Sequence, residues 1–219
     1  MQQGQQTHPP KNAAKKIIFG TLLISIGYAI LRYHIMGPVP WKDFPFFIIN
    51  KGFSLAAFIL IGINFSLGPL NNLTKKVSQS WLDARKAVGM TGFLLVLIHA
   101  LMSFILFKKE VYGQFFQDNG TLTMIAGISM LAGVLGFVVL WAYNLSFQTH
   151  LKEDKAFIGF LTSRTFLMWA LTLGLVHLVF MGYKGWSDPS GWHGGLPPIS
   201  LLGFSFGMIC YIINFMGRK

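Results

Sequence analysis

Residues 87–107 read AVGMTGFLLVLIHALMSFILF, a stretch of 21 residues without a charged side chain. About 20 predominantly apolar residues are enough for a helix to cross the hydrocarbon core of a bilayer. The stretch therefore predicts a membrane-spanning helix. The same pattern recurs, and it predicts helices at about 17–36, 44–67, 84–107, 122–143, 160–183 and 198–216. Because these runs are longer than strands and do not alternate, the predicted fold class is an all-α polytopic membrane protein, a six-transmembrane-helix bundle.

The composition of the whole chain also indicates a membrane protein. Hydrophobic residues make up 53% of the 219 residues and charged residues 11%, against roughly 25% charged in a soluble domain. So few charges cannot cover the surface of a water-soluble globule, and membrane lipid is the expected surrounding of the helices. Cys210 is the only cysteine, which excludes a disulfide scaffold.

The basic residues predict the orientation. The net charge is +11, and Lys and Arg are concentrated in alternate loops, with twelve on the side of the two termini and five on the other. The positive-inside rule then predicts cytoplasmic N and C termini for a multi-pass protein of the plasma (inner) membrane. The basic clusters are short and form no continuous basic face, so no nucleic acid partner is expected.

The N-terminal residues are the one polar segment of any length. Residues 1–14 are expected to be a disordered cytoplasmic tail, and residues 15–219 the six-helix domain. The basic residues before the first apolar run resemble the start of a signal peptide. No small-x-small cleavage site follows them, so the run is interpreted as an uncleaved first helix. No Gly-rich phosphate loop is present in the sequence.

Two histidines lie inside predicted spans, where ionisable side chains are costly and often functional. His99 lies eight residues before residue 107 and His177 six before residue 183, which places them roughly 12 Å and 9 Å below the same membrane surface at 1.5 Å per residue. A planar cofactor held by one histidine on each face requires two rings at one level. A hydrogen bond from each histidine to a neighbouring helix explains them equally well. Zinc is disfavoured, because no further His, Cys or carboxylate is expected at that depth.

Small and polar residues surround both histidines in the sequence. Gly89, Gly92 and Gly174 lie at helical spacings from them and would admit either a flat macrocycle or a tightly packed helix. Hydroxyl groups that could accept a hydrogen bond from the imidazoles belong to Thr91, Ser103 and Thr172.

The two histidine-bearing spans resemble a known family. Residues 81–93, WLDARKAVGMTGF, are followed by Leu97, Ile98 and His99, and this order is similar to the Arg-Lys-x-x-Gly…Phe…His signature of the ferric reductase-like transmembrane domain, especially its STEAP-type metalloreductase branch. Residues 173–186, LGLVHLVFMGYKGW, resemble the second haem-histidine motif of that branch. The likeness covers approximately residues 80–215, and Leu196-Pro197-Pro198 opens the last helix as in that branch.

The resemblance implies one haem b with His99 and His177 as axial ligands and as its metal-binding residues. Electrons would move outward to ferric or cupric ions. Two-haem relatives have a further histidine on each ligand helix, but Lys86 and Arg164 stand 13 residues before His99 and His177, which argues for a single haem. The cytoplasmic NADPH-flavin domain of full metalloreductases is missing from the sequence. A separate flavoprotein, FAD or FMN at the cytoplasmic side, or membrane quinol is therefore expected as the donor. Trimers in the branch suggest a homo-oligomer.

Cations at the two ends of the spans are further candidates for cofactor binding. Haem propionates require cations, and Lys51, with Arg32 behind it, is the candidate at the outer end; snorkelling to lipid headgroups is the alternative. Arg85, Lys86 and Arg164 at the inner end are candidates for an anionic flavin phosphate, although the orientation rule alone also explains them.

The predicted function is transmembrane electron transfer through haem b, with reduction of ferric or cupric ions at the outer face. One alternative is a haem-containing membrane anchor that passes quinol electrons to a periplasmic redox protein. Another is a scaffold or transporter without haem, in which both histidines only bridge helices.

Overall fold

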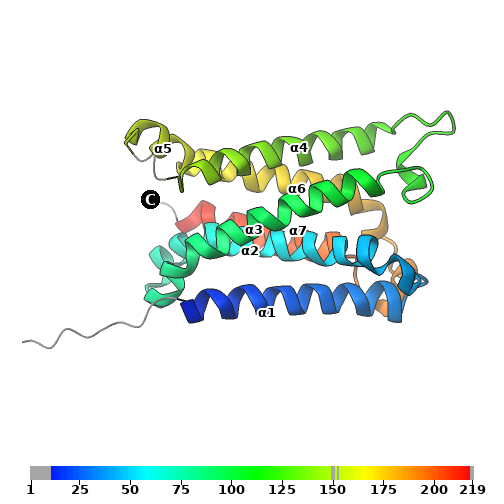
Figure 1. The fold of residues 1–219 in the computed structure, drawn as a ribbon, viewed down its shortest axis with the longest axis horizontal. Coiled ribbons are helices and arrows are strands. Elements are labelled where there is room, and N and C mark those ends of the chain that lie inside the picture. The colour runs from blue at the N-terminus through cyan, green and yellow to red at the C-terminus, as the bar shows by residue number, and fades with distance from the viewer. Residues whose placement is uncertain (1–10, 149–150, 152, 218–219) are drawn as a thin grey trace, which may run out of the picture.

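The computed structural model describes residues 11–148, 151 and 153–217. The described chain contains no strand, and six of its helical segments are long and apolar enough to cross a membrane, so the predicted all-α six-helix bundle is confirmed (Figure 1). The helices are α1 (Lys11–Ala29), α2 (Ile49–Thr74), α3 (Gln79–Leu106), α4 (Met124–Leu145), the short α5 (Lys155–Leu161), α6 (Arg164–Trp186) and α7 (Ile199–Gly217).

The start of α1 corrects the predicted boundary of the tail. Residues 11–14 were expected to be disordered, but α1 begins at Lys11. Alanine and lysine are good helix formers, and Ala14 is buried in an apolar cluster that also contains Ala84 of α3. The rest of the expected tail, residues 1–10, lies outside the described residues.

Local sequence explains where the other helices begin and end. The predicted second span ends at residue 67, but α2 continues through a buried Pro69 and ends where Lys75 takes a left-handed conformation at φ 56°. The fifth span begins at Arg164, because the Ser163 side chain accepts a hydrogen bond from the backbone N–H of Phe166. The Thr123 side chain caps α4 in the same way through the N–H of Ala126.

The helices form two groups that share α7. Helix α2 is central and packs against α1, α3 and α7, whereas α4 packs against α6, which also packs on α7 (Figure 1). Helix α3 has little contact with α4, and it makes no substantial contact with α6. Helices α3 and α6, which bear the candidate histidines, therefore pack against different helices: α3 against α2, and α6 against α4 and α7.

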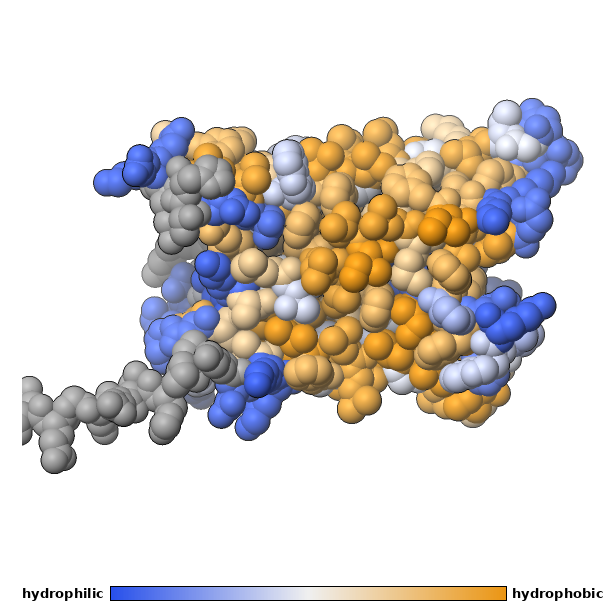
Figure 2. Space-filling model, in the orientation of Figure 1, coloured by the Kyte–Doolittle hydropathy of each residue, from blue (hydrophilic) through white to orange (hydrophobic). Residues whose placement is uncertain are grey.

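The surface has the pattern expected of a membrane bundle. On the face shown in Figure 2, a broad apolar band covers the middle of the molecule, and hydrophilic residues gather at its two ends. Large apolar side chains in this band are exposed, among them Leu23 at 76% and Leu131 at 60%, and lipid is the medium that would cover them. We call the end where α1 begins and α7 ends the terminal end, and the opposite end the distal end (Figure 1).

Candidate functional site

His99 is held on α3 by a side chain of α2. Its Nδ1 lies 2.7 Å from Asn50 Oδ1 and 3.3 Å from Ser103 Oγ, and Asn50 Nδ2 donates to Ser103 Oγ at 3.1 Å. Asn50 is 2% exposed, so its amide has no water to exchange with. Ser103 is four residues from His99 on one face of α3, which is why a single amide reaches both.

His177 is held on α6 by α4. Its Nδ1 lies 2.9 Å from the backbone carbonyl oxygen of Ser129 and 3.2 Å from Ser129 Oγ. The Ser129 hydroxyl also lies 3.1 Å from the carbonyl of His177, to which it donates. Gly133, four residues along the same face of α4, lies against the ring: a Cβ atom there would be 2.9 Å from His177 Nδ1. Glycine at this position lets the imidazole lie directly on the α4 backbone.

These hydrogen bonds fix the tautomer of both rings. An amide oxygen and a backbone carbonyl oxygen accept hydrogen bonds and cannot donate them, so Nδ1 carries the proton in both His99 and His177. Each neutral imidazole then has its lone pair on Nε2. Within the described chain, neither Nε2 has a hydrogen-bond partner, and neither is sealed from the surroundings: the sealed side-chain polar atoms without partners belong to Ser25, Asn64 and Asn214.

The two histidines lie at similar depths near the distal end. His99 lies seven residues before the end of α3 and His177 nine before the end of α6, which is about 10 Å and 14 Å along straight helices. The two rings lie within electrostatic range of each other, and the Lys51 ammonium lies within range of both. Both residues are half-buried. The two histidines therefore lie toward the same end of the bundle, on helices that do not pack tightly together.

Three of the glycines near the histidines pack against neighbouring helices. A Cβ atom on Gly89 would meet the amide of Asn64, one on Gly92 would meet Ile61, and one on Gly174 would meet Phe58, all three of which belong to α2. Helix packing, the second of the two roles that the sequence allowed, accounts for these three. Of the hydroxyls considered from the sequence, Ser103 lies beside His99, while Thr172 donates to the Met168 carbonyl of its own helix.

The cations at the distal end contact aromatic rings. Lys51 Nζ lies 5.4 Å from the centroid of Phe47 and 5.1 Å from that of Tyr112, so the ammonium contacts both rings. Arg32 is 4% exposed, and its Nε donates to the Pro197 carbonyl at 2.9 Å. Arg32 thus ties the end of the first span to the segment that leads into α7.

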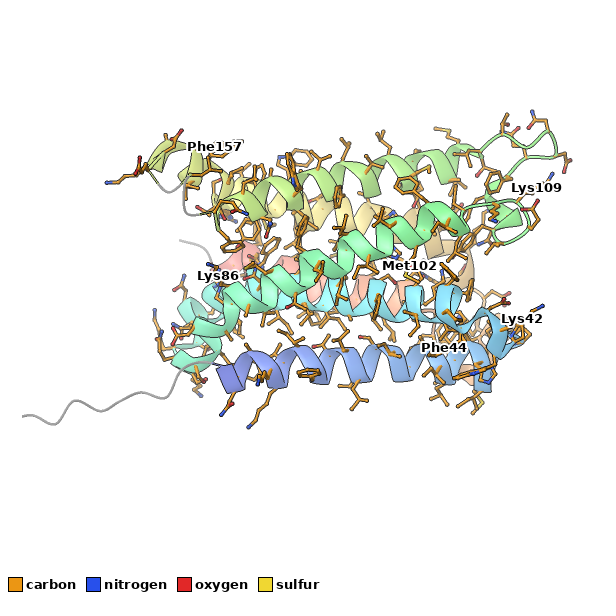
Figure 3. The ribbon with its side chains drawn as sticks, in the orientation of Figure 1. Lys42, Phe44, Lys86, Met102, Lys109 and Phe157 are labelled. Carbon is orange, nitrogen blue, oxygen red and sulfur yellow. The ribbon has the colours of Figure 1, made fainter. Side chains whose placement is uncertain are left out.

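The three basic candidates at the terminal end are not brought together. Arg85 is half-buried, and its Nε donates to the Asn64 carbonyl at 3.1 Å. Lys86 is exposed at this end, 5.9 Å from the Phe147 ring centroid (Figure 3). Arg164 is also exposed, and it donates to the Phe215 carbonyl at 3.0 Å. Of the three, Arg85 lines a pocket.

That pocket has a volume of about 400 Å³ and is formed by α2, α3, α4, α6 and the residue before α6's cap. Its lining combines hydrogen-bonding groups with apolar ones, and consists of Gly68, Pro69, Asn72, Arg85, Tyr143, Thr162 and Leu167. The Tyr143 hydroxyl in its lining accepts a hydrogen bond from Nδ2 of the buried Asn64 at 3.3 Å. The pocket therefore offers a guanidinium, a phenol and an amide beside an apolar wall.

The described residues contain no group of three or more His, Cys, Asp or Glu side chains that could hold a metal ion by themselves. A pair of histidines suits a metal whose other ligands are supplied by a macrocycle. Sequence reasoning missed Asn50, Ser129 and Gly133, because each belongs to a helix other than that of the histidine it contacts. No protein-family profile matches the chain, and no curated protein is significantly similar to it.

Proposed function

We propose that the protein is a haem b transmembrane electron-transfer protein, which reduces ferric or cupric ions at its outer face with electrons from a cytoplasmic flavin donor. The observation that carries the proposal is the pair of imidazoles on α3 and α6. Each has Nδ1–H bound to an oxygen of another helix, and each leaves Nε2 without a partner in the described chain. Metal-ligating histidines are typically oriented in this way.

The two imidazoles, those of His99 and His177, have the chemistry that axial ligands of a haem require. A simple helix bridge needs only the Nδ1–H bonds, whereas haem ligation also needs an unengaged Nε2, and neither Nε2 has a hydrogen-bond partner among the described residues. Haem b, when bound by His99 and His177, supplies a one-electron carrier. The Lys51 ammonium, within electrostatic range of both rings, is the candidate partner for a propionate.

The pocket at the terminal end is the candidate donor site. Arg85 and the Tyr143 hydroxyl can hold the polar edge of a flavin or quinol ring, and Leu167 and Pro69 can cover its apolar face. Each flavin hydroquinone that is oxidised there gives two electrons, which reduce two ferric ions at the distal end, and its protons leave on the donor side. The likeness to the ferric reductase-like family supports the outward direction.

The test is an electron-transfer assay with the protein reconstituted in lipid vesicles. Proteoliposomes that enclose reduced FMN are placed in an impermeant ferric chelate, and ferrous ion is measured outside with a colour-forming chelator. We expect ferrous production that depends on the wild-type protein and is absent from a His99→Ala and His177→Ala double variant. Reduction with menaquinol but not with FMN would replace the flavin donor by the quinol alternative. No production with either donor would contradict the proposal.

A further inference from the structure

The two candidate ligands differ in the group that accepts their Nδ1 proton. His177 donates to a main-chain carbonyl, that of Ser129, which no substitution can remove. His99 donates to the side chain of Asn50, at the shorter distance of 2.7 Å. Of these two closest acceptors, only the one at His99 depends on the identity of a residue.

Asn50 is fully committed to this contact. It is 2% exposed, its Oδ1 accepts from His99, and its Nδ2 donates to Ser103 Oγ. With Oδ1 toward the ring and Nδ2 toward the serine, the amide accepts from His99 Nδ1–H and donates to Ser103 Oγ. His99, Asn50 and Ser103 therefore form one connected set of hydrogen bonds.

The strength of this acceptor reaches the metal through the ring. A stronger acceptor pulls the Nδ1 proton away and makes Nε2 more basic, while loss of the acceptor makes Nε2 less basic. A more basic ligand stabilises ferric iron relative to ferrous iron and lowers the reduction potential. The residue at position 50 is therefore placed to act on the iron without touching it.

We propose that Asn50 is a positioning residue that sets the reduction potential of the haem through the Nδ1–H of His99. This inference rests on the proposed function, because it requires a haem on His99. An amide gives an intermediate acceptor strength. The potential should therefore move in opposite directions when the acceptor is strengthened and when it is removed.

The experiment is a spectroelectrochemical titration of detergent-purified protein with Asn50→Asp and Asn50→Leu. The carboxylate is expected to lower the midpoint potential relative to wild type, and leucine, which has a similar volume and no acceptor, is expected to raise it. Electron paramagnetic resonance should show the low-spin ferric signal altered in the sense of a more basic ligand for aspartate only. A purely structural role predicts loss of haem without opposite shifts.

Ser129→Ala is the matched control on the His177 side, because it removes the hydroxyl and leaves the main-chain carbonyl that accepts from Nδ1. Its potential should move less than that of either Asn50 variant. If Asn50→Leu yields no folded protein, the comparison of Asn50→Asp with wild type decides, and an unchanged or higher potential overturns the inference. Equal or same-direction shifts in both Asn50 variants also overturn it and leave the proposed function standing. Wild-type protein that takes up no haem overturns both.

Discussion

The distal and terminal ends of the bundle use their polar residues differently. At the distal end, His99 and His177 are each held by a short hydrogen bond to a different helix, and neither Nε2 has a partner among the described residues. At the terminal end, Arg164 and Lys86 are exposed and rest on nearby aromatic rings. A side chain that is held in one orientation and keeps an unbonded ligand atom indicates a ligand site. An exposed cation that contacts only nearby residues indicates an interface with water or lipid headgroups.

Arg85 is the exception at the terminal end, because it lines a pocket. The comparison therefore predicts a separation of effects. Substitutions at the distal end should change the haem itself, and substitutions in the pocket should change only how fast a donor reduces it.

Gly133→Ala should have the largest effect of the single substitutions outside the ligands. The added Cβ would lie 2.9 Å from His177 Nδ1, and overpacking of this kind typically costs about 1–3 kcal/mol. We expect a lower thermal midpoint and a reduced haem content. The control is Gly127→Ala on the same helix, where nothing lies within 4 Å and alanine should be neutral or stabilising by up to ~1 kcal/mol. Equal effects of the two substitutions would show that His177 does not depend on the open face of α4.

Arg85→Ala should slow reduction by the donor about tenfold, which corresponds to about 1.4 kcal/mol in the barrier. The guanidinium lines the pocket and donates to the Asn64 carbonyl, so its loss removes the only cation there among the lining residues. Stopped-flow mixing with reduced FMN gives the rate, and the reduced-minus-oxidised spectrum should stay unchanged. A changed spectrum with a normal rate would reverse the roles of the two ends.

Lys51→Met distinguishes two roles of the same ammonium. Loss of the contacts with Phe47 and Tyr112 should lower stability by about 1 kcal/mol in either case. If Lys51 also neutralises a propionate, its removal stabilises the ferric state, so we expect a lower midpoint potential. Potentiometry together with a thermal melt measures both quantities. Reduced stability with an unchanged potential would leave Lys51 as an aromatic-bound structural cation.

Arg164→Ala should have the smallest effect. The side chain is exposed, and substitutions at such positions usually change stability by less than about 0.5 kcal/mol. Neither the haem spectrum nor the rate of reduction by FMN should differ from wild type in the assays described above. A loss of donor rate as large as that of Arg85→Ala would extend the donor site beyond the pocket.

The sequence predicts the bundle well, because spanning a bilayer requires long apolar runs that are visible without tertiary information. It also predicts that His99 and His177 lie inside spanning helices, because both belong to long apolar runs. Helix ends were less accurate. The α2 helix continues past Pro69 and α1 starts at Lys11, because packing and local caps decide the last turns.

The partners of the histidines lie beyond the reach of periodicity. Asn50 is 49 residues from His99 and Ser129 is 48 from His177, and which faces of α2 and α4 meet these rings depends on helix rotation. The signal available in the sequence was Asn50 itself, a polar side chain inside the predicted span 44–67, because such a side chain needs a hydrogen-bond partner in the bundle. The same dependence on rotation explains why Gly89, Gly92 and Gly174 accommodate side chains of α2.

The most direct test of the central claim is a reduced-minus-oxidised absorption spectrum of the detergent-purified protein produced with haem supplied. Wild type should show the sharp bands of one low-spin, bis-histidine haem b per chain. His99→Ala and His177→Ala should each lose them, while His34→Ala, whose Nδ1 lies 2.9 Å from the Val39 carbonyl near the distal surface, should keep them. A colourless wild-type protein, or full low-spin haem in either ligand variant, would contradict the account.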